Sequence, residues 1–213
     1  MEGITDEKIL RYVFKEIIKA LNGLHKAGLA HRDIKLENIM VTHNYEVRLI
    51  DLGMFSELAG ANKSGFFRSK KGTPQYMCPE VHSGKTYQGT DADIFAVGVS
   101  LFIMRMYKYP FQAAISQGQH ADINFCSLQQ SNTDQYWSAF EDSPSPEFKN
   151  LIEVMLQEDP GARLTMSDLI GHPWMTLETA TQEEFREKYK SVLGNMSNYP
   201  EYAVDFDRKD AEE

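Results

Sequence analysis

The stretch from Ala92 to Tyr107 is the feature that most constrains the fold, because it is apolar almost throughout (ADIFAVGVSLFIMRMY). A helix that is apolar on nearly every side has to be covered by other elements of the protein. We therefore expect a buried helix over these residues, ended by Pro110-Phe111. No run in the chain reaches the roughly 18 apolar residues that a membrane span needs. The sequence thus predicts a helix at the centre of a protein core and no segment in a membrane.

Other segments have the apolar periodicity of helices that are buried on one face. Apolar residues recur at helical spacing over residues 9–24, which predicts an amphipathic helix capped by Thr5 or Asp6. A second helix is expected to begin at Ser145-Pro146 and to stop before Pro160. Two shorter helices are expected, one near Thr165–Ile170 and one around Glu183–Val192.

Strand signals are confined to one short hairpin. Residues 38–41 and 47–50 are short apolar stretches joined by the loop Thr42–Tyr45. Residues 51–80 carry six Gly or Pro residues without sustained periodicity, which is typical of a long functional loop. Residues 112–142 give no clear assignment. The predicted fold is therefore mainly α with a small β-hairpin.

The charge of the chain argues against one class of partner. It has 31 acidic and 22 basic residues and a formal net charge of −9, whereas phosphate backbones are bound by clustered positive charge. We therefore expect no nucleic acid partner. The two cysteines, Cys78 and Cys126, are too few for a disulfide framework or a zinc site, which fits a reducing, cytoplasmic setting with the nucleus left open. Residues 177–213 hold ten acidic and five basic residues, and we interpret them as an acidic C-terminal tail with a short helix.

Three motifs in a fixed order carry the chemistry. The first is His31-Arg32-Asp33-Ile34-Lys35-Leu36-Glu37-Asn38, followed by Asp51-Leu52-Gly53 after the second strand and by Cys78-Pro79-Glu80. In this order, spacing and strand context, the chain resembles the protein kinase superfamily. The resemblance implies that residues 1–176 form the large C-terminal lobe of a kinase domain, and Asp93 and Arg163 are further matching positions.

The resemblance also implies ATP and Mg²⁺ as cofactors and gives a role to each polar residue. Asp33 would accept or orient the proton of the substrate hydroxyl, and Lys35 would reach the transferred phosphate. Asn38 and Asp51 would offer oxygen ligands to Mg²⁺, since the predicted hairpin holds them at adjacent strand ends. Asp33, Lys35 and Asn38 are thus the expected catalytic residues. The expected cofactor-binding residues are Lys35, Glu37, Asn38, Met40 and Asp51. Of these, Met40 would form the floor under adenine.

Lys35 and the segment Gly72-Thr73-Pro74-Gln75-Tyr76 narrow the class of substrate. This pattern resembles serine/threonine kinases, in which the Thr hydroxyl contacts the catalytic Asp and Lys beside the docking peptide. Thr73 is therefore expected to meet Asp33 and Lys35. Glu37 is expected to attract a basic residue upstream of the Ser or Thr acceptor in a protein substrate. The residues that give a loose likeness to the calcium/calmodulin-dependent kinase group are Glu37-Asn38 and His172-Pro173-Trp174.

Arg32, beside the catalytic Asp, resembles kinases that are switched by phosphorylation of the long loop. A phosphate adds about −1.5 to −2 charge and can order a loop against Arg. Ser69 is the expected regulatory phosphosite and Ser64 the second choice, although Ser56 stands where the family often has another base. The expected structural residues are Arg32, Asp93 as an anchor of the catalytic loop, and Glu80 with Arg163 as a buried ion pair.

The sequence lacks part of the family's nucleotide site. Neither a Gly-x-Gly-x-x-Gly loop nor an equivalent of the family's Val-Ala-Ile-Lys strand occurs in the 213 residues. The expectation is a truncated kinase domain without its N-terminal ATP lobe, and a serine/threonine kinase that is weak or inactive by itself. The alternative is a non-catalytic docking or regulatory module derived from a kinase. Exposed apolar surface is then expected to receive a missing small lobe or a partner protein.

Overall fold

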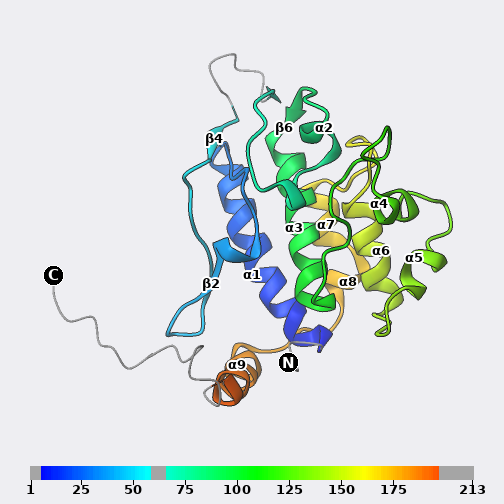
Figure 1. Ribbon diagram of the computed structural model, residues 1–213. Coiled ribbons are helices and arrows are strands. Elements are labelled where there is room, and N and C mark those ends of the chain that lie inside the picture. Colours follow the sequence, from blue (N-terminus) through cyan, green and yellow to red (C-terminus); the bar gives the residue numbers. More distant parts are fainter. Residues whose placement is uncertain (1–5, 59–65, 197–213) are drawn as a thin grey trace.

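The computed structural model describes residues 6–58 and 66–196, and over these residues it is mainly helical. Helix α3 (Gly89–Met106) runs through the centre of the molecule (Figure 1). Helix α1 (Glu7–Lys26) packs on one side of α3, and α6 (Pro146–Met155) packs on the other. The arrangement follows from the sequence, because an apolar helix is stable only where amphipathic helices cover it.

The apolar segment forms α3 much as its sequence predicts. The helix begins at Gly89, three residues before Ala92, and it ends at Met106, one residue before Tyr107. The end is set by Tyr107, which takes a left-handed conformation with φ 54° and donates its N–H to the Ile103 carbonyl. A residue in this conformation breaks the helical hydrogen-bond ladder, so no proline is needed to stop it.

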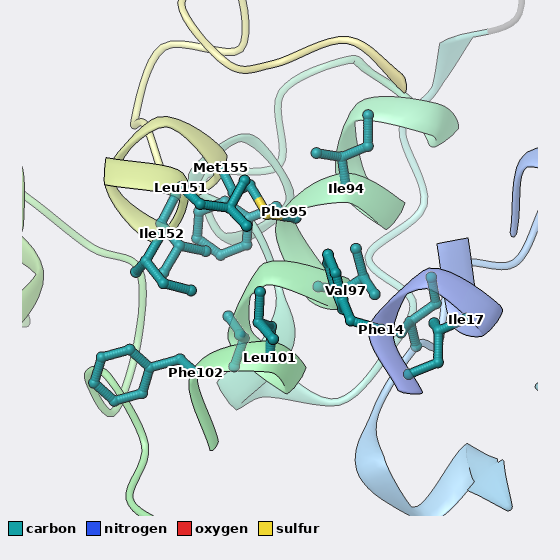
Figure 2. Packing of buried hydrophobic residues seen from close by; sticks show 14 of the residues in the cluster. Phe14, Ile17, Ile94, Phe95, Val97, Leu101, Phe102, Leu151, Ile152 and Met155 are labelled. Carbon is teal, nitrogen blue, oxygen red and sulfur yellow. The ribbon is translucent and has the colours of Figure 1, made fainter. Parts of the chain in front are cut away.

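Figure 2 shows how α3 fills the core. Phe95 of α3 lies toward Leu151 and Met155 of α6. On the opposite side of α3, Val97 lies toward Phe14 of α1. All five side chains are fully buried, and burial of apolar surface is the dominant favourable contribution to folding. The core therefore lies between three helices that are far apart in the sequence.

The caps of α1 and α6 agree with the expected helix starts. The carboxylate of Asp6 accepts a hydrogen bond from the Lys8 N–H at 2.8 Å, which makes Asp6 the N-cap of α1. Thr5, the other candidate, lies outside the described residues. The hydroxyl of Ser145 accepts from the Phe148 N–H at 3.2 Å and caps α6 in the same way.

The predicted hairpin consists of β2 (Ile39–Val41) and β3 (Val47–Leu49), which pair antiparallel. Its turn ends at Tyr45, whose N–H donates to the Thr42 carbonyl at 2.9 Å. The hairpin packs on α1 through β3, in which Val47 is buried.

The structure adds strands that the sequence does not predict. Each has two residues, so no alternation of apolar and polar side chains can reveal it. Two of them, β4 and β5, lie within the long loop and pair with strands outside it, which gives two small sheets, β1 with β4 and β5 with β6. The four strands are β1 (Leu29–Ala30), β4 (Ser56–Glu57), β5 (Phe66–Phe67) and β6 (Tyr87–Gln88).

The remaining elements are short helices around the right-hand side of the core in Figure 1. Two of them, α4 and α5, occupy the region that has no clear sequence assignment, and the Asp122 carboxylate caps α4. Two further turns, Leu36–Asn38 and Pro74–Tyr76, are 3₁₀ helices. The short α-helices are α2 (Pro79–His82), α4 (Ile123–Leu128), α5 (Asp134–Ser138), α7 (Met166–Gly171) and α8 (Pro173–Thr176).

Helix α9 (Gln182–Met196) is the helix that the sequence predicts in the acidic tail. It lies on α1, because Phe185 is buried there and its ring centroid is 5.2 Å from that of Tyr12. The rest of the tail, residues 197–213, lies outside the described part. Among the helices of residues 6–58 and 66–196, none combines the length and the apolar character of a membrane-spanning segment.

Candidate active site

The loop that begins at His31 is fastened to the core by α3. The carboxylate of Asp93 accepts hydrogen bonds from the backbone N–H groups of His31, at 2.9 Å, and of Arg32, at 2.7 Å. His25, in the last turn of α1, contacts the same carboxylate, with 2.9 Å between Nε2 and Oδ2. Asp93 is only 1% exposed, so these bonds fix the loop backbone against the interior.

The Asp33 carboxylate, the Lys35 ammonium and the Thr73 hydroxyl all contact one another. Lys35 Nζ is 3.0 Å from one carboxylate oxygen, and the Thr73 hydroxyl donates to the other at 3.0 Å. Lys35 also donates to the Thr73 hydroxyl at 3.2 Å. The hydrogen bond to Asp33 raises the pKa of Lys35, so its ammonium group stays charged at neutral pH. The contact of Thr73 that the sequence predicts is present, while its part in substrate docking stays a prediction.

Arg32 connects this loop to the long loop that follows the hairpin. Its backbone is left-handed, with φ 68°, and its side chain is buried. The guanidinium donates to the hydroxyls of Ser56 at 2.8 Å, Ser69 at 2.5 Å and Tyr87 at 2.7 Å. It also stacks on Phe67, 4.3 Å from the ring centroid. Arg32 therefore holds the long loop through side chains that carry no phosphate. Ser64, the second candidate phosphosite, lies outside the described residues.

Asn38 and Asp51 lie at the base of the hairpin, on neighbouring strand ends. The Ile50 N–H donates to the Asn38 carbonyl at 2.9 Å. The side-chain amide of Asn38 donates to the Asp33 carbonyl at 2.8 Å, which leaves its Oδ1 atom for another partner. Asp51 is exposed, has φ 62°, and accepts from the Gly53 N–H with one carboxylate oxygen at 2.9 Å.

This donor pair fits Mg²⁺ in the manner of a nucleotide site. Mg²⁺ prefers oxygen ligands, keeps several waters, and takes one or two protein groups together with substrate phosphates. Over the described residues there is no group of three or more His, Cys, Asp or Glu side chains that could hold an ion. Asn38 and Asp51 would therefore hold Mg²⁺ only together with the phosphates of a bound nucleotide.

Two other candidate residues, Met40 and Glu37, are exposed. Met40 is 51% exposed, so the described residues leave this proposed adenine floor largely open to water. Burial raises the pKa of Tyr76, and the Glu37 carboxylate adds to this effect. Glu37 therefore lies near Tyr76, while its part in substrate docking stays a prediction.

Glu80 of α2 and Arg163, between α6 and α7, form a buried, bidentate ion pair. The two contacts are 2.8 and 3.1 Å long, and the side chains are 6% and 1% exposed. Arg163 also donates to the carbonyls of Asp91 and Gln157. Burial by itself would raise the pKa of Glu80, but the Arg163 guanidinium outweighs it and holds that pKa below its usual value. The pair fastens α2 to the core.

Tyr87 and Phe67 are residues of this region that sequence reasoning misses. Tyr87 is buried and donates to the Ser69 carbonyl at 2.9 Å, so it adds a further bond to those that Arg32 makes with Ser69. Phe67 stacks on Arg32 and lies 6.0 Å from the Tyr87 ring. Both come from two-residue strands, which leave no periodic signal.

The chain is similar in sequence to known proteins over most of its length. Residues 1–175 match the protein kinase domain. The chain is 34% identical over 206 residues to maternal embryonic leucine zipper kinase of Danio rerio, a match that covers 94% of this chain and 28% of that protein. It is 28% identical over 217 residues to the SNF1-like protein kinase ssp2 of Schizosaccharomyces pombe, with 97% and 35% covered.

A third relative is the serine/threonine-protein kinase chk1 of Schizosaccharomyces pombe, which is 29% identical over 175 residues, with 82% of this chain and 34% of that protein covered. The chain thus spans about a third of the length of the curated relatives it matches.

Proposed function

Because this chain belongs to the protein kinase family, we propose that it transfers the terminal phosphate of ATP to a serine or threonine hydroxyl of a protein. The contact between Asp33 and Thr73 carries this proposal. A buried carboxylate there accepts a hydrogen bond from an aliphatic hydroxyl at 3.0 Å, and the Lys35 ammonium lies within 3.2 Å of both groups. A serine or threonine of a substrate offers the same kind of hydroxyl.

Each residue then has a definite task. Asp33 orients the acceptor hydroxyl and takes its proton, and the Lys35 charge stabilises negative charge on the transferred phosphate. Asn38 Oδ1 and a carboxylate oxygen of Asp51 would hold Mg²⁺. When bound, ATP supplies the phosphoryl group and Mg²⁺ offsets the charge of its phosphates. The bonds from Asp93 to the loop backbone keep Asp33 and Lys35 in position.

The test incubates the chain with ATP, Mg²⁺ and peptides that carry one acceptor hydroxyl, and measures phosphopeptide by mass spectrometry. We expect a low yield of phosphate on serine and threonine peptides, in keeping with a chain that is weak by itself, and none on tyrosine peptides. Asp33→Asn should reduce the product to background, since an amide cannot accept the proton. Asp134→Asn, at an exposed position in α5, is the matched control. If Asp33→Asn formed as much phosphopeptide as Asp134→Asn, the assignment of Asp33 as the catalytic residue would be contradicted.

The same peptides test Glu37. If its carboxylate recognises a basic residue upstream of the acceptor, Glu37→Gln should lower the preference for such peptides several-fold while leaving neutral peptides unchanged. A wild-type chain with no preference for basic peptides would remove this role from Glu37.

For these 213 residues tested by themselves, we propose weak nucleotide binding. The sequence has no Gly-x-Gly-x-x-Gly loop, and Met40 is half exposed. Positioning of reactants can lower a barrier by about 7–11 kcal/mol, and a site that is open on one side forfeits part of this. Calorimetric titration with ATP and Mg²⁺ measures the affinity, and tight binding would contradict this part of the proposal.

A second candidate is a non-catalytic docking or regulatory module. It is favoured by the apolar side chains of Met40, Leu52, Met54 and Phe55, which are between 39% and 51% exposed near the proposed metal ligands. A partner protein or a small lobe that covers them would remove this surface from water. Asp33→Asn separates the two candidates, because it should abolish phosphate transfer and leave binding of a partner intact.

A further inference from the structure

The ring of Tyr45, at the turn of the β2–β3 hairpin, receives three side chains of α9. The Tyr189 ring meets it edge to face, with centroids 6.2 Å apart. The Arg186 guanidinium lies 5.2 Å and the Lys190 ammonium 5.6 Å from the Tyr45 ring centroid. Such geometry suits the charge distribution of an aromatic ring. In Figure 1, α9 accordingly lies beside the tip of the hairpin.

Tyr45 is an unusual residue for its place in the turn. Its φ is 60°, in the left-handed region that Gly, Asn and Asp enter more readily than an aromatic residue. The backbone bond from its N–H to the Thr42 carbonyl would form with other residues at this position as well. The backbone thus gives no reason for a tyrosine here, whereas the contacts with α9 do.

The hairpin needs support of this kind. Each strand has three residues, and an isolated two-stranded hairpin is at best marginally stable in water. One support is α1, against which Val47 is buried. Helix α9 is itself held on α1 through Phe185 and Tyr12. It therefore links the tip of the hairpin to a helix of the core.

The other end of the hairpin carries the proposed metal ligands. Asn38 directly precedes β2, Asp51 follows β3 and Ile50, and the Ile50 N–H donates to the Asn38 carbonyl. We propose that Tyr45 is a positioning residue: it receives α9 at the tip of the hairpin and thereby holds Asn38 and Asp51 in place at the base. The part that concerns metal and nucleotide rests on the proposed function.

The test compares Tyr45→Phe with Tyr45→Leu in the full 213-residue chain. Both variants keep an apolar side chain at the same left-handed backbone position, and only phenylalanine keeps the aromatic face. Without nucleotide or metal, Tyr45→Leu should increase amide hydrogen exchange of residues 38–51 about tenfold, and Tyr45→Phe should stay within about twofold of wild type. Exchange over residues 89–106, in α3, should be the same in all three proteins.

A second measurement addresses the ligands. In calorimetric titrations of the chain with ATP at saturating Mg²⁺, the midpoint for Tyr45→Leu should lie several-fold above that of wild type, and the midpoint for Tyr45→Phe should not. The proposal is overturned if Tyr45→Leu raises exchange only in α9, or if it leaves this midpoint unchanged. If even the wild-type chain binds no nucleotide, the proposed function fails, and exchange of residues 38–51 still decides whether Tyr45 supports the hairpin.

Variants on α9 complete the test. Tyr189→Leu removes the partner ring and leaves the turn untouched, so it should reproduce the effect on residues 38–51 even if Tyr45→Leu does not fold. Lys188→Gln removes a charge from the same helix at a side chain that is not among the Tyr45 ring contacts, and it should behave like wild type. Equal effects of Lys188→Gln and Tyr189→Leu would contradict a specific role of the ring.

Discussion

Arg32 carries a buried positive charge whose hydrogen-bond partners are neutral hydroxyl and carbonyl groups. It donates to Ser56, Ser69 and Tyr87, and over the described residues no carboxylate lies within ion-pair distance of it. Its Nε atom is also buried there without a hydrogen-bond partner. A phosphate on Ser69 would bring the missing negative charge directly to this guanidinium. The geometry therefore supports the sequence-based hypothesis that Ser69 is a regulatory phosphosite.

Ser69→Ala tests this hypothesis at a single residue. The change removes the bond between Arg32 and the Ser69 hydroxyl, and a hydrogen bond to a charged group contributes about 1.5–3 kcal/mol. Exchange of residues 66–76 should therefore increase roughly tenfold or more. In an enzyme that has its complete nucleotide site, activation by loop phosphorylation should be abolished. Ser69→Thr keeps the hydroxyl and is the control; unchanged exchange and unchanged activation in Ser69→Ala would contradict the hypothesis.

The Glu80–Arg163 pair gives a prediction about stability. Glu80→Gln leaves the Arg163 charge buried without its counter-charge, and breaking a buried pair in this way costs about 3–5 kcal/mol. Glu46→Gln is the matched control, because Glu46 forms an exposed pair with Arg48, a kind of pair worth about 0–1 kcal/mol. Urea unfolding measures both free energies. Equal losses in the two variants would show that burial of the Glu80 pair has no special weight.

At the scale of elements, the sequence predicts those parts that have a local pattern. The helical period identifies α1 and α6, the continuous apolar run identifies α3, and the motif order brings Asp33 and Lys35 to one loop. The sequence does not predict β5 and β6. Nor does it predict the contact of Tyr87 with Arg32, which joins positions 55 residues apart. Such a contact depends on the tertiary fold and leaves no periodic trace in either segment.

Two glycines in helices test the packing of these elements. A Cβ atom on Gly98 of α3 would lie 3.0 Å from the Met155 Cβ and 3.1 Å from a Leu156 methyl group. Gly98→Ala should therefore destabilise the protein by about 1–3 kcal/mol through overpacking. Gly23 of α1 has open space at the same atom, so Gly23→Ala should instead stabilise the protein by about 0.5–1 kcal/mol. Urea unfolding of both variants measures the signs, and the same sign for both would contradict this packing.

At the scale of the whole molecule, Glu7 ties four helices together. Its carboxylate accepts from the backbone N–H and hydroxyl of Ser145, at 2.8 and 2.6 Å, and from the Trp174 indole N–H at 2.9 Å. The Arg105 guanidinium, near the end of α3, lies 3.8 Å away. One carboxylate in the first turn of α1 therefore holds the ends of α3, α6 and α8.

This carboxylate makes stability depend on pH. Burial by itself would raise the pKa of Glu7, but the bonds from Ser145 and Trp174 and the charge of Arg105 outweigh it and hold the pKa below its ordinary value of 4.5. A lowered folded-state pKa contributes stability that is present above the unfolded pKa and is lost as pH falls through the folded pKa. The free energy of unfolding of the wild type should therefore fall more steeply between about pH 6 and about pH 3 than that of Glu7→Gln.

Urea unfolding at a series of pH values measures these slopes. Glu16→Gln is the control, since within residues 6–58 and 66–196 Glu16 forms only a longer ion pair with Lys19 on the surface, at 3.7 Å, and its slope should match that of the wild type. If Glu7→Gln lost stability with the same slope as the wild type, the acid sensitivity would originate elsewhere in the chain.

The bonds from Asp93 to the backbone of His31 and Arg32 span 62 and 61 positions of sequence. A ribosome makes the chain from its N-terminus, so the loop with Asp33 is synthesised well before the helix that anchors it. Those backbone N–H groups gain the Asp93 carboxylate as their acceptor only once α3 has been made and has packed in the core. The positions of Asp33 and Lys35 therefore depend on a helix that is made after the loop that carries them.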